Sequence, residues 1–102
     1  MYTQRITLYP AAGKQAAIQQ LLTEQAKKRQ ARGQRIALAT SVVGDRPSFV
    51  VTIFHENLAD FEKFRHANQK DPDFAAYQAK LQPLLSDVPQ MELLEVLVPP
   101  QP

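Results

Sequence analysis

Apolar and polar residues alternate along residues 2–9, which are rich in β-branched and aromatic side chains, so this segment is predicted to form a strand. Residues 10–13 interrupt the pattern. Residues 14–32 are nearly all strong helix formers, and Gly33 stands where a glycine commonly ends a helix. The apolar stripe of this predicted helix recurs at helical spacing and comprises Ile18, Leu21, Leu22 and Ala26.

Two further runs have strand composition, at residues 35–43 and 48–55. Residues 44–47, Gly-Asp-Arg-Pro, separate them and predict the turn of an antiparallel hairpin. One face of the first run carries Ile36, Leu38, Thr40 and Val42, and one face of the second carries Phe49, Val51 and Ile53.

A second helical region begins after Asn57, which is suited to the N-cap position with Asp60 three residues later. Asp71 and Pro72 predict a restart of the helix rather than its end, because Asp caps helices well and Pro fits the first turn. Residues 90–98 predict a final buried strand, and the proline-rich residues 99–102 cannot join a sheet ladder. The apolar positions of the helical region are Leu58, Phe61, Phe64, Phe74, Tyr77, Leu81, Leu84 and Leu85.

The resulting order, β-α-β-β-α-β, predicts an α+β, ferredoxin-like fold, in which a four-stranded antiparallel sheet carries two helices on one face. We assign residues 1–98 to a single domain and residues 99–102 to a C-terminal tail. Because two helices cover only one face, and apolar residues occur on both faces, the other face needs a partner. A second copy of the chain, packed sheet to sheet, is the simplest one.

The amino-acid composition excludes several kinds of functional site but does not identify one. The chain has 102 residues, 44% of them hydrophobic, which suits one globular domain. With no cysteine, it has no disulfide framework, thiolate nucleophile or cysteine metal site. Its three glycines form neither a phosphate loop nor a dinucleotide fingerprint, so we expect no cofactor and no metal. No apolar run suits a membrane span or a signal peptide, and a cytoplasmic location is the default expectation.

Charge is distributed unevenly around the net value of +2. Residues 1–44 contain seven Lys and Arg and one acid, whereas residues 45–102 contain five Lys and Arg and nine acids. The predicted helix 14–32 ends in a basic cluster, which we interpret as a solvated helix C-terminus, because cations there oppose the negative end of the helix dipole. No aromatic or nucleic-acid motif accompanies it, so tight nucleic-acid binding is not expected. The cluster consists of Lys27, Lys28, Arg29, Arg32 and Arg35.

Four short segments carry a family resemblance. Residues 5–14, Arg-Ile-Thr-Leu-Tyr-Pro-Ala-Ala-Gly-Lys, lead a strand into a helix, and residues 49–55 precede the acidic segment 56–62. The restart at residues 71–74, Asp-Pro-Asp-Phe, looks like a Ser-Pro-His-Phe step, and residues 81–85 read Leu-Gln-Pro-Leu-Leu. Over residues 4–98 the chain thereby resembles the dimeric α/β barrel superfamily, specifically the small domains related to antibiotic-biosynthesis monooxygenases.

This resemblance implies a homodimeric barrel whose subunits oxidise a small aromatic molecule without a cofactor. The chain departs from the pattern at the end of the third strand, where relatives often carry Trp and this chain carries His55. Haem-degrading relatives use an Asn, a Trp and a His. The corresponding positions here hold Gln4 and Gln78, and the chain has no Trp, so haem degradation is not supported.

His55 is the candidate catalytic residue, because histidine is the side chain most readily tuned for proton transfer near pH 7. A hydrogen-bonded role at the strand-to-helix junction is the alternative. His66 is expected to face solvent, and His55-Glu56 begins like a zinc motif that lacks its second His. Arg5 could pair with Glu95 or hold a ligand carboxylate. The candidate substrate-binding residues are Tyr9, Phe49, Phe54, Tyr77 and Arg5.

Three functions remain open from the sequence. The first is a cofactor-independent monooxygenase acting on a small aromatic molecule, and the second is a non-catalytic homodimeric module that binds a ligand or has a structural role. Nucleic-acid binding through the basic cluster ranks below both. A ligand-sized cavity beside His55 would favour the enzyme, whereas an interior plugged by side chains would favour the module.

Overall fold

Strand β1, Tyr2–Leu8, lies at the centre of the sheet in the computed structural model, which describes residues 1–100. Strands β3, Phe49–His55, and β4, Gln90–Glu95, pair with β1 on its two sides, and β2, Ile36–Thr40, pairs with β3 at one edge. All three pairings are antiparallel, in the order β2-β3-β1-β4. This order confirms the ferredoxin-like fold. Residues 101 and 102 of the predicted tail lie outside the described residues.

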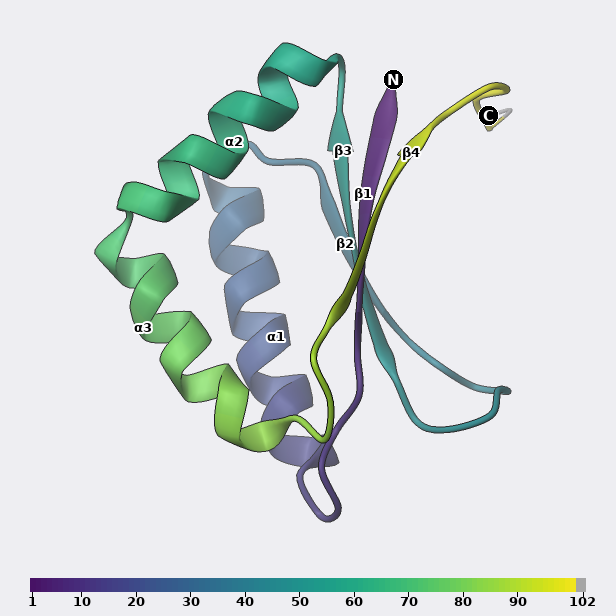
Figure 1. Ribbon diagram of the computed structural model, residues 1–102, viewed down its shortest axis with the longest axis vertical. Helices are drawn as coiled ribbons and strands as arrows, with labels where there is room; N and C mark the ends of the chain where they lie inside the picture. Colours follow the sequence, from purple (N-terminus) through teal and green to yellow (C-terminus); the bar gives the residue numbers. More distant parts are fainter. Residues whose placement is uncertain (101–102) are drawn as a thin grey trace.

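All the helices pack on one face of the sheet (Figure 1). They are α1, Gln15–Ala31; α2, Leu58–Lys70; and α3, Pro72–Leu81, which continues into the short 3-10 helix η1, Gln82–Leu84. The second predicted helical region is therefore two α-helices. The predicted restart is confirmed, since the Asp71 carboxylate accepts a hydrogen bond from the Asp73 N–H at 2.9 Å and caps α3.

The hairpin strand β2 ends earlier than predicted, at Thr40 rather than at residue 43. Ser41 and Ser48 make the last contacts across the hairpin, where each backbone N–H donates to the other residue, at 3.0 Å in both cases. Beyond them Pro47 has no N–H to continue the ladder. Val42 therefore does not share the buried face of β2 and is 93% exposed.

The last strand, β4, also ends earlier than predicted, at Glu95 rather than at residue 98. Its neighbour β1 begins at Tyr2, which is the residue opposite Glu95. The Val96 N–H still donates to the Met1 carbonyl at 2.9 Å, one residue beyond the end of β4. The strand is exposed along its whole length rather than buried, because it lies at the edge of the sheet, and Leu97 beyond it is exposed as well.

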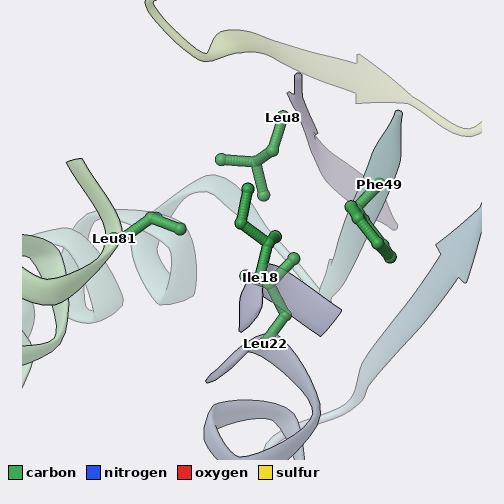
Figure 2. Packing of buried hydrophobic residues seen from close by; sticks show 5 residues of the cluster. All are labelled: Leu8, Ile18, Leu22, Phe49 and Leu81. Carbon is green, nitrogen blue, oxygen red and sulfur yellow. The ribbon is translucent and has the colours of Figure 1, made fainter. Parts of the chain in front are cut away.

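The core lies between the sheet and the helices at the end where β1 finishes. Figure 2 shows its five buried residues, which come from β1, α1, β3 and α3. Leu8 pairs with Phe49 across the sheet, and Ile18 is fully buried beneath them. Burying each such side chain contributes about 1.5–3 kcal/mol. The core residues are Leu8, Ile18, Leu22, Phe49 and Leu81.

The opposite face of the sheet, which we call the open face, is covered by no helix within residues 1–100 (Figure 1). Strand alternation places a mixed set of apolar, threonine and charged side chains on it. Its residues are Thr3, Arg5, Thr7, Ala37, Ala39, Val50, Thr52, Phe54, Gln90, Glu92 and Leu94. Among residues 1–100, no helix is long and apolar enough to cross a membrane.

Candidate functional site

A cavity of about 280 Å³ lies between the sheet and the helices, beside the core. Strands β1, β3 and β4 supply aliphatic side chains from one side, and α2 and α3 supply aromatic rings from the other. The wall is therefore mostly apolar, as in most small-molecule sites. The apolar residues of the wall include Ile6, Val51, Ile53, Phe64, Phe74 and Met91.

A few polar side chains also line the cavity. Gln4 on β1 and Arg29 on α1 are both buried, while Tyr77 on α3 is half-buried. Asn68 and Gln78 add amide groups from α2 and α3. An apolar wall with a small number of polar groups suits a ligand that has an apolar body and a polar substituent.

Arg29 is the least expected of these residues, because the sequence placed it in the solvated basic cluster. It is only 5% exposed. The error has a simple cause: Arg29 follows Leu22 by seven residues, so it lies on the same face of α1 as the core residues. Its guanidinium carbon lies 5.6 Å from the Phe64 ring centroid and 5.3 Å from that of Phe74. Burial, together with Arg32, lowers the pKa of Arg29, and Asp71 partly opposes this change.

The neighbouring cations of the cluster face solvent, as expected. Lys28 pairs with Asp73 at 3.7 Å, and Arg32 pairs with Asp71 at 3.6 Å and with Asp73 at 3.7 Å. Hydrogen bonding from the Asp73 N–H, with support from Arg32, lowers the pKa of Asp71. These pairs join the end of α1 to the start of α3, and so hold in place two of the helices that bound the cavity.

His55, the candidate catalytic residue, is buried next to the cavity but does not line it. Its Nε2 lies 3.2 Å from Gln4 Oε1, and the Gln4 amide nitrogen donates to Met91 Sδ at 3.3 Å. Because an amide oxygen only accepts, Nε2 carries the proton of a neutral imidazole. Desolvation lowers the pKa of His55, which favours that neutral form. Gln4 therefore separates His55 from the cavity.

The His55 ring is also held by aromatic contacts at the junction between β3 and α2. It meets Phe61 and Phe64 edge to face, with ring centroids 5.4 and 5.3 Å apart. A smaller pocket on the outer side of the ring is lined by His55, Phe64 and Asp60. These contacts fit the alternative role, a hydrogen-bonded junction residue.

Tyr77 is the one predicted binding residue that lines the cavity. Its ring packs against Phe74, with centroids 5.9 Å apart. Burial raises the pKa of the Tyr77 phenol to about 12, although Arg29 opposes the rise. At neutral pH this hydroxyl is therefore protonated and can donate a hydrogen bond to a ligand.

The other predicted binding residues lie elsewhere. Phe49 is a core residue and borders a second pocket, of about 360 Å³, near the hairpin loop instead of the cavity. Phe54 and Arg5 lie on the open face, because strand alternation turns them away from the helices. Arg35 stacks over the Phe54 ring, with its guanidinium carbon 5.4 Å from the centroid. Tyr9 also lies away from the cavity.

Two contacts explain the position of Tyr9. The Arg46 guanidinium lies 3.6 Å from the Tyr9 ring centroid and pairs with Asp87 at 2.8 Å, and the Tyr9 hydroxyl donates to Gln90 Oε1 at 3.0 Å. This arrangement ties the hairpin loop to the segment that leads into β4. Tyr9 is thus engaged in a structural contact.

Of the two alternatives for Arg5, pairing with Glu95 is excluded by the strand register. Arg5 lies opposite Glu92, whereas Glu95 lies opposite Tyr2 and on the other face of the sheet. The sequence could establish which residues alternate but not the register that sets their partners. Among residues 1–100, no group of three His, Cys, Asp or Glu side chains is placed to hold a metal ion.

Comparison with known proteins identifies the family. The model of the NIPSNAP family matches residues 4–97. The chain belongs to the NIPSNAP family. None of the curated proteins compared with this NIPSNAP chain matches it. Solved structures that do match are similar over nearly their whole length.

Three of these structures show how widely the fold is shared. An uncharacterised NIPSNAP domain protein from Burkholderia xenovorans has a TM-score of 0.82 and 17% identity, covering 99% of this chain and 100% of that one. A NIPSNAP family protein from Agrobacterium tumefaciens has a TM-score of 0.78 and 18% identity, covering 92% and 90%. A protein from Nitrosomonas europaea described as a candidate antibiotic biosynthesis monooxygenase has a TM-score of 0.77 and 12% identity, covering 96% and 100%.

The resemblance to the dimeric α/β barrel superfamily is confirmed by these matches, which include both NIPSNAP and monooxygenase-like structures. At these levels of identity they establish the fold alone. The family assignment rests on the NIPSNAP match, a name that the motifs of the sequence did not supply.

Proposed function

We propose that this NIPSNAP-family protein binds a small aromatic molecule in the cavity between its sheet and its helices. The observation that carries the proposal is the cavity itself, about 280 Å³ of space with a mostly apolar wall. Small-molecule sites begin near about 300 Å³ and share this kind of wall. Two buried core residues, Leu8 and Leu81, form part of this wall.

An aromatic ligand suits the residues on the helical side and on the sheet side of the cavity. Rings of Phe64, Phe74 and Tyr77 line the helical side, while Val51 and Ile53 form part of the flatter sheet side. A planar ring between them makes aromatic contacts with one side and aliphatic contacts with the other. The polar groups of the cavity then select the substituents of that ring.

Binding is tested with 1-naphthol, whose fluorescence changes when it leaves water. Val51 and Val50 are neighbours on β3 with opposite faces, so they offer a matched pair of substitutions. Val51→Phe fills the cavity and is expected to weaken binding by about 5–150-fold, since overpacking typically costs about 1–3 kcal/mol. Val50→Phe adds the same bulk to the open face and is expected to leave the affinity unchanged. Equal effects of both variants would reject the cavity as the site.

Oxygenation of the bound molecule is the finer part of the proposal, supported by the monooxygenase-like proteins that share the fold. A phenol that loses its proton can donate electrons to dioxygen from a ring carbon. One oxygen atom stays on that carbon as a carbonyl and the other leaves as water, so 1-naphthol and one O₂ give 1,4-naphthoquinone and water. The substrate supplies all the electrons, and no cofactor is required.

His55 is the proposed acceptor of the phenolic proton. It reaches a ligand only when the Gln4 side chain moves aside, and Nε2 accepts the proton only after the imidazole has shifted its own proton from Nε2 to Nδ1. His55→Ala is then expected to lower turnover by about 10²–10⁴-fold. Oxygen uptake and naphthoquinone formation measure it, and His66→Ala, an exposed change on α2, serves as the control. Turnover equal to wild type would remove His55 from the chemistry. Binding of 1-naphthol without oxygen uptake would favour the non-catalytic ligand-binding module.

The proposal includes a homodimer formed through the open face. Val50, Phe54 and Leu94 expose apolar surface there, and no helix within residues 1–100 covers it. Nucleic acid is not proposed as a partner, since Arg29 is buried and both Lys28 and Arg32 are paired with carboxylates.

A further inference from the structure

Arg29 is a buried cation for which the protein supplies no close anion. Within residues 1–100, its guanidinium forms no ion pair within 4 Å and donates no side-chain hydrogen bond. A guanidinium carries five N–H donors, and buried cations are normally paired with acids or hydrogen-bond acceptors. The Phe64 and Phe74 rings stabilise the charge in part, but they provide no oxygen acceptor.

The nearest acids already have partners. Asp71 accepts the Asp73 N–H and pairs with Arg32, and Asp73 pairs with both Lys28 and Arg32. These contacts lie on the solvent side of the helices, where the side chains of Lys28 and Arg32 are 51% and 43% exposed. Arg29, which follows the core residues along α1, faces inward and lines the cavity.

The wall around Arg29 contains no carboxylate. All the residues that line the cavity are apolar or neutral apart from Arg29 itself. Opposite charges attract more strongly beside an apolar wall than in bulk water, because the effective dielectric constant is lower there. An anion that enters this cavity therefore meets one cation and no acid.

We propose that the ligand of this cavity is an aromatic carboxylate whose carboxylate group binds Arg29. This inference rests on the proposed function, since it names the class of the aromatic molecule that the cavity binds. The planar guanidinium suits a planar carboxylate, to which it can donate two parallel hydrogen bonds. The aromatic body of the ligand then occupies the space between the rings of α2 and α3 and the aliphatic face of the sheet.

Two probes that share one naphthalene ring system and have similar size separate the roles of charge and ring. 1-Naphthoate carries a carboxylate, and 1-naphthylmethanol carries a neutral hydroxymethyl group on the same ring system. Calorimetric titration of the wild-type protein is expected to show tighter binding of 1-naphthoate by at least about tenfold, in line with the strength of charged hydrogen bonds. This comparison needs no variant and so does not depend on how well a variant folds.

Substitutions then assign the preference to Arg29. Arg29→Met keeps an unbranched apolar stem and removes the charge, and it is expected to weaken 1-naphthoate binding by about 10–100-fold while leaving 1-naphthylmethanol within about twofold. Lys28→Met removes the same charge from the exposed side of α1 and is the matched control, expected to leave both affinities unchanged.

Failure of the anion inference can be distinguished from failure of the proposed function. Equal affinities of both probes for the wild-type protein, or an equal loss of 1-naphthoate binding in Arg29→Met and Lys28→Met, would overturn the anion inference and leave the aromatic cavity standing. Failure of the wild-type protein to bind either naphthalene probe at millimolar concentration would overturn the proposed function and, with it, this inference.

Discussion

His55 combines a buried imidazole with a single polar partner, the Gln4 amide oxygen. The ring gains two edge-to-face aromatic contacts but loses the water that would solvate its charged form. The folded protein therefore holds it neutral, with Nε2 donating to Gln4. Protonation of His55 is therefore coupled to the stability of the junction between β3 and α2.

A pH dependence of stability follows from the lowered pKa of His55. The unfolded chain, in which a histidine titrates near about 6.5, takes up this proton more readily than the folded chain. The contribution of the neutral ring is thus complete above about pH 6.5 and is lost as the pH falls below it. Thermal unfolding between pH 8 and pH 5.5 is expected to show a falling Tm, and His55→Gln is expected to flatten the profile.

His66→Gln is the control for this pH experiment, because His66 is exposed on α2 and its one ion-pair partner among residues 1–100 is Glu62, at 3.6 Å. This variant is expected to keep the wild-type profile. A profile that flattens in His66→Gln but not in His55→Gln would contradict the account of the buried ring.

Single residues also differ in how well their positions can be predicted from the sequence. The spacing of Arg29 from Ile18 and Leu22 already places it on the buried face of α1, so its position could have been predicted from the helical period. The positions of Tyr9 and Phe54 relative to the cavity could not be predicted in this way. Alternation tells which residues share a face, but both faces of the sheet carry apolar residues, so the pattern does not tell which face borders a cavity.

At the scale of elements, helix α2 places Phe64 and Asn68 in the cavity wall, and its start is set by Asn57. The Asn57 Oδ1 atom accepts a hydrogen bond from the Asp60 N–H at 2.8 Å. This bond satisfies one of the N–H groups that a helix start leaves unpaired.

Asn57→Ala is expected to destabilise the protein by about 1 kcal/mol, the usual cost of a lost N-cap. For a domain of this size that corresponds to a decrease in Tm of about 4–8 °C. Asn57→Asp keeps the accepting oxygen and is expected to retain the wild-type Tm. Differential scanning calorimetry measures both variants, and equal losses in the two would show that the cap oxygen does not set the start of α2.

The elements themselves were largely predictable, and their ends were less so. Helix α1 and the restart before α3 follow from local residue preferences. The ends of β2 and β4 depend instead on where a partner strand stops, as the pairing of Tyr2 with Glu95 shows. A strand boundary set by a neighbour far away in the sequence cannot be deduced from composition.

At the scale of the whole molecule, the open face is the feature that predicts a second copy. In Figure 1 the hairpin loop between β2 and β3 extends toward this side of the sheet, away from the helices. Sheets that pack face to face bury the side chains of alternate residues in each strand. The open face has such a set, in which Val50 and Phe54 are half-buried even in the isolated chain.

Light scattering at micromolar concentration is expected to give the mass of a dimer. Phe54→Glu introduces a charge into the proposed interface and is expected to give a monomer, because an unpaired charge in a contact is strongly unfavourable. Glu56→Gln, on the exposed turn after β3, is the control and is expected to remain dimeric. A wild-type monomer at this concentration would refute the sheet-to-sheet homodimer.

The central claim is that a small aromatic molecule occupies the cavity between the sheet and the helices. Methyl-labelled protein titrated with 1-naphthoate and followed by nuclear magnetic resonance tests it most directly, because an aromatic ring shifts the signals of the methyl groups beside it. Ile6 and Met91 line the cavity, whereas Val50 and Leu94 lie on the open face. The account predicts saturable shifts at Ile6 and Met91 with Val50 and Leu94 unchanged. Shifts confined to Val50 and Leu94, or no shifts at all, would contradict it.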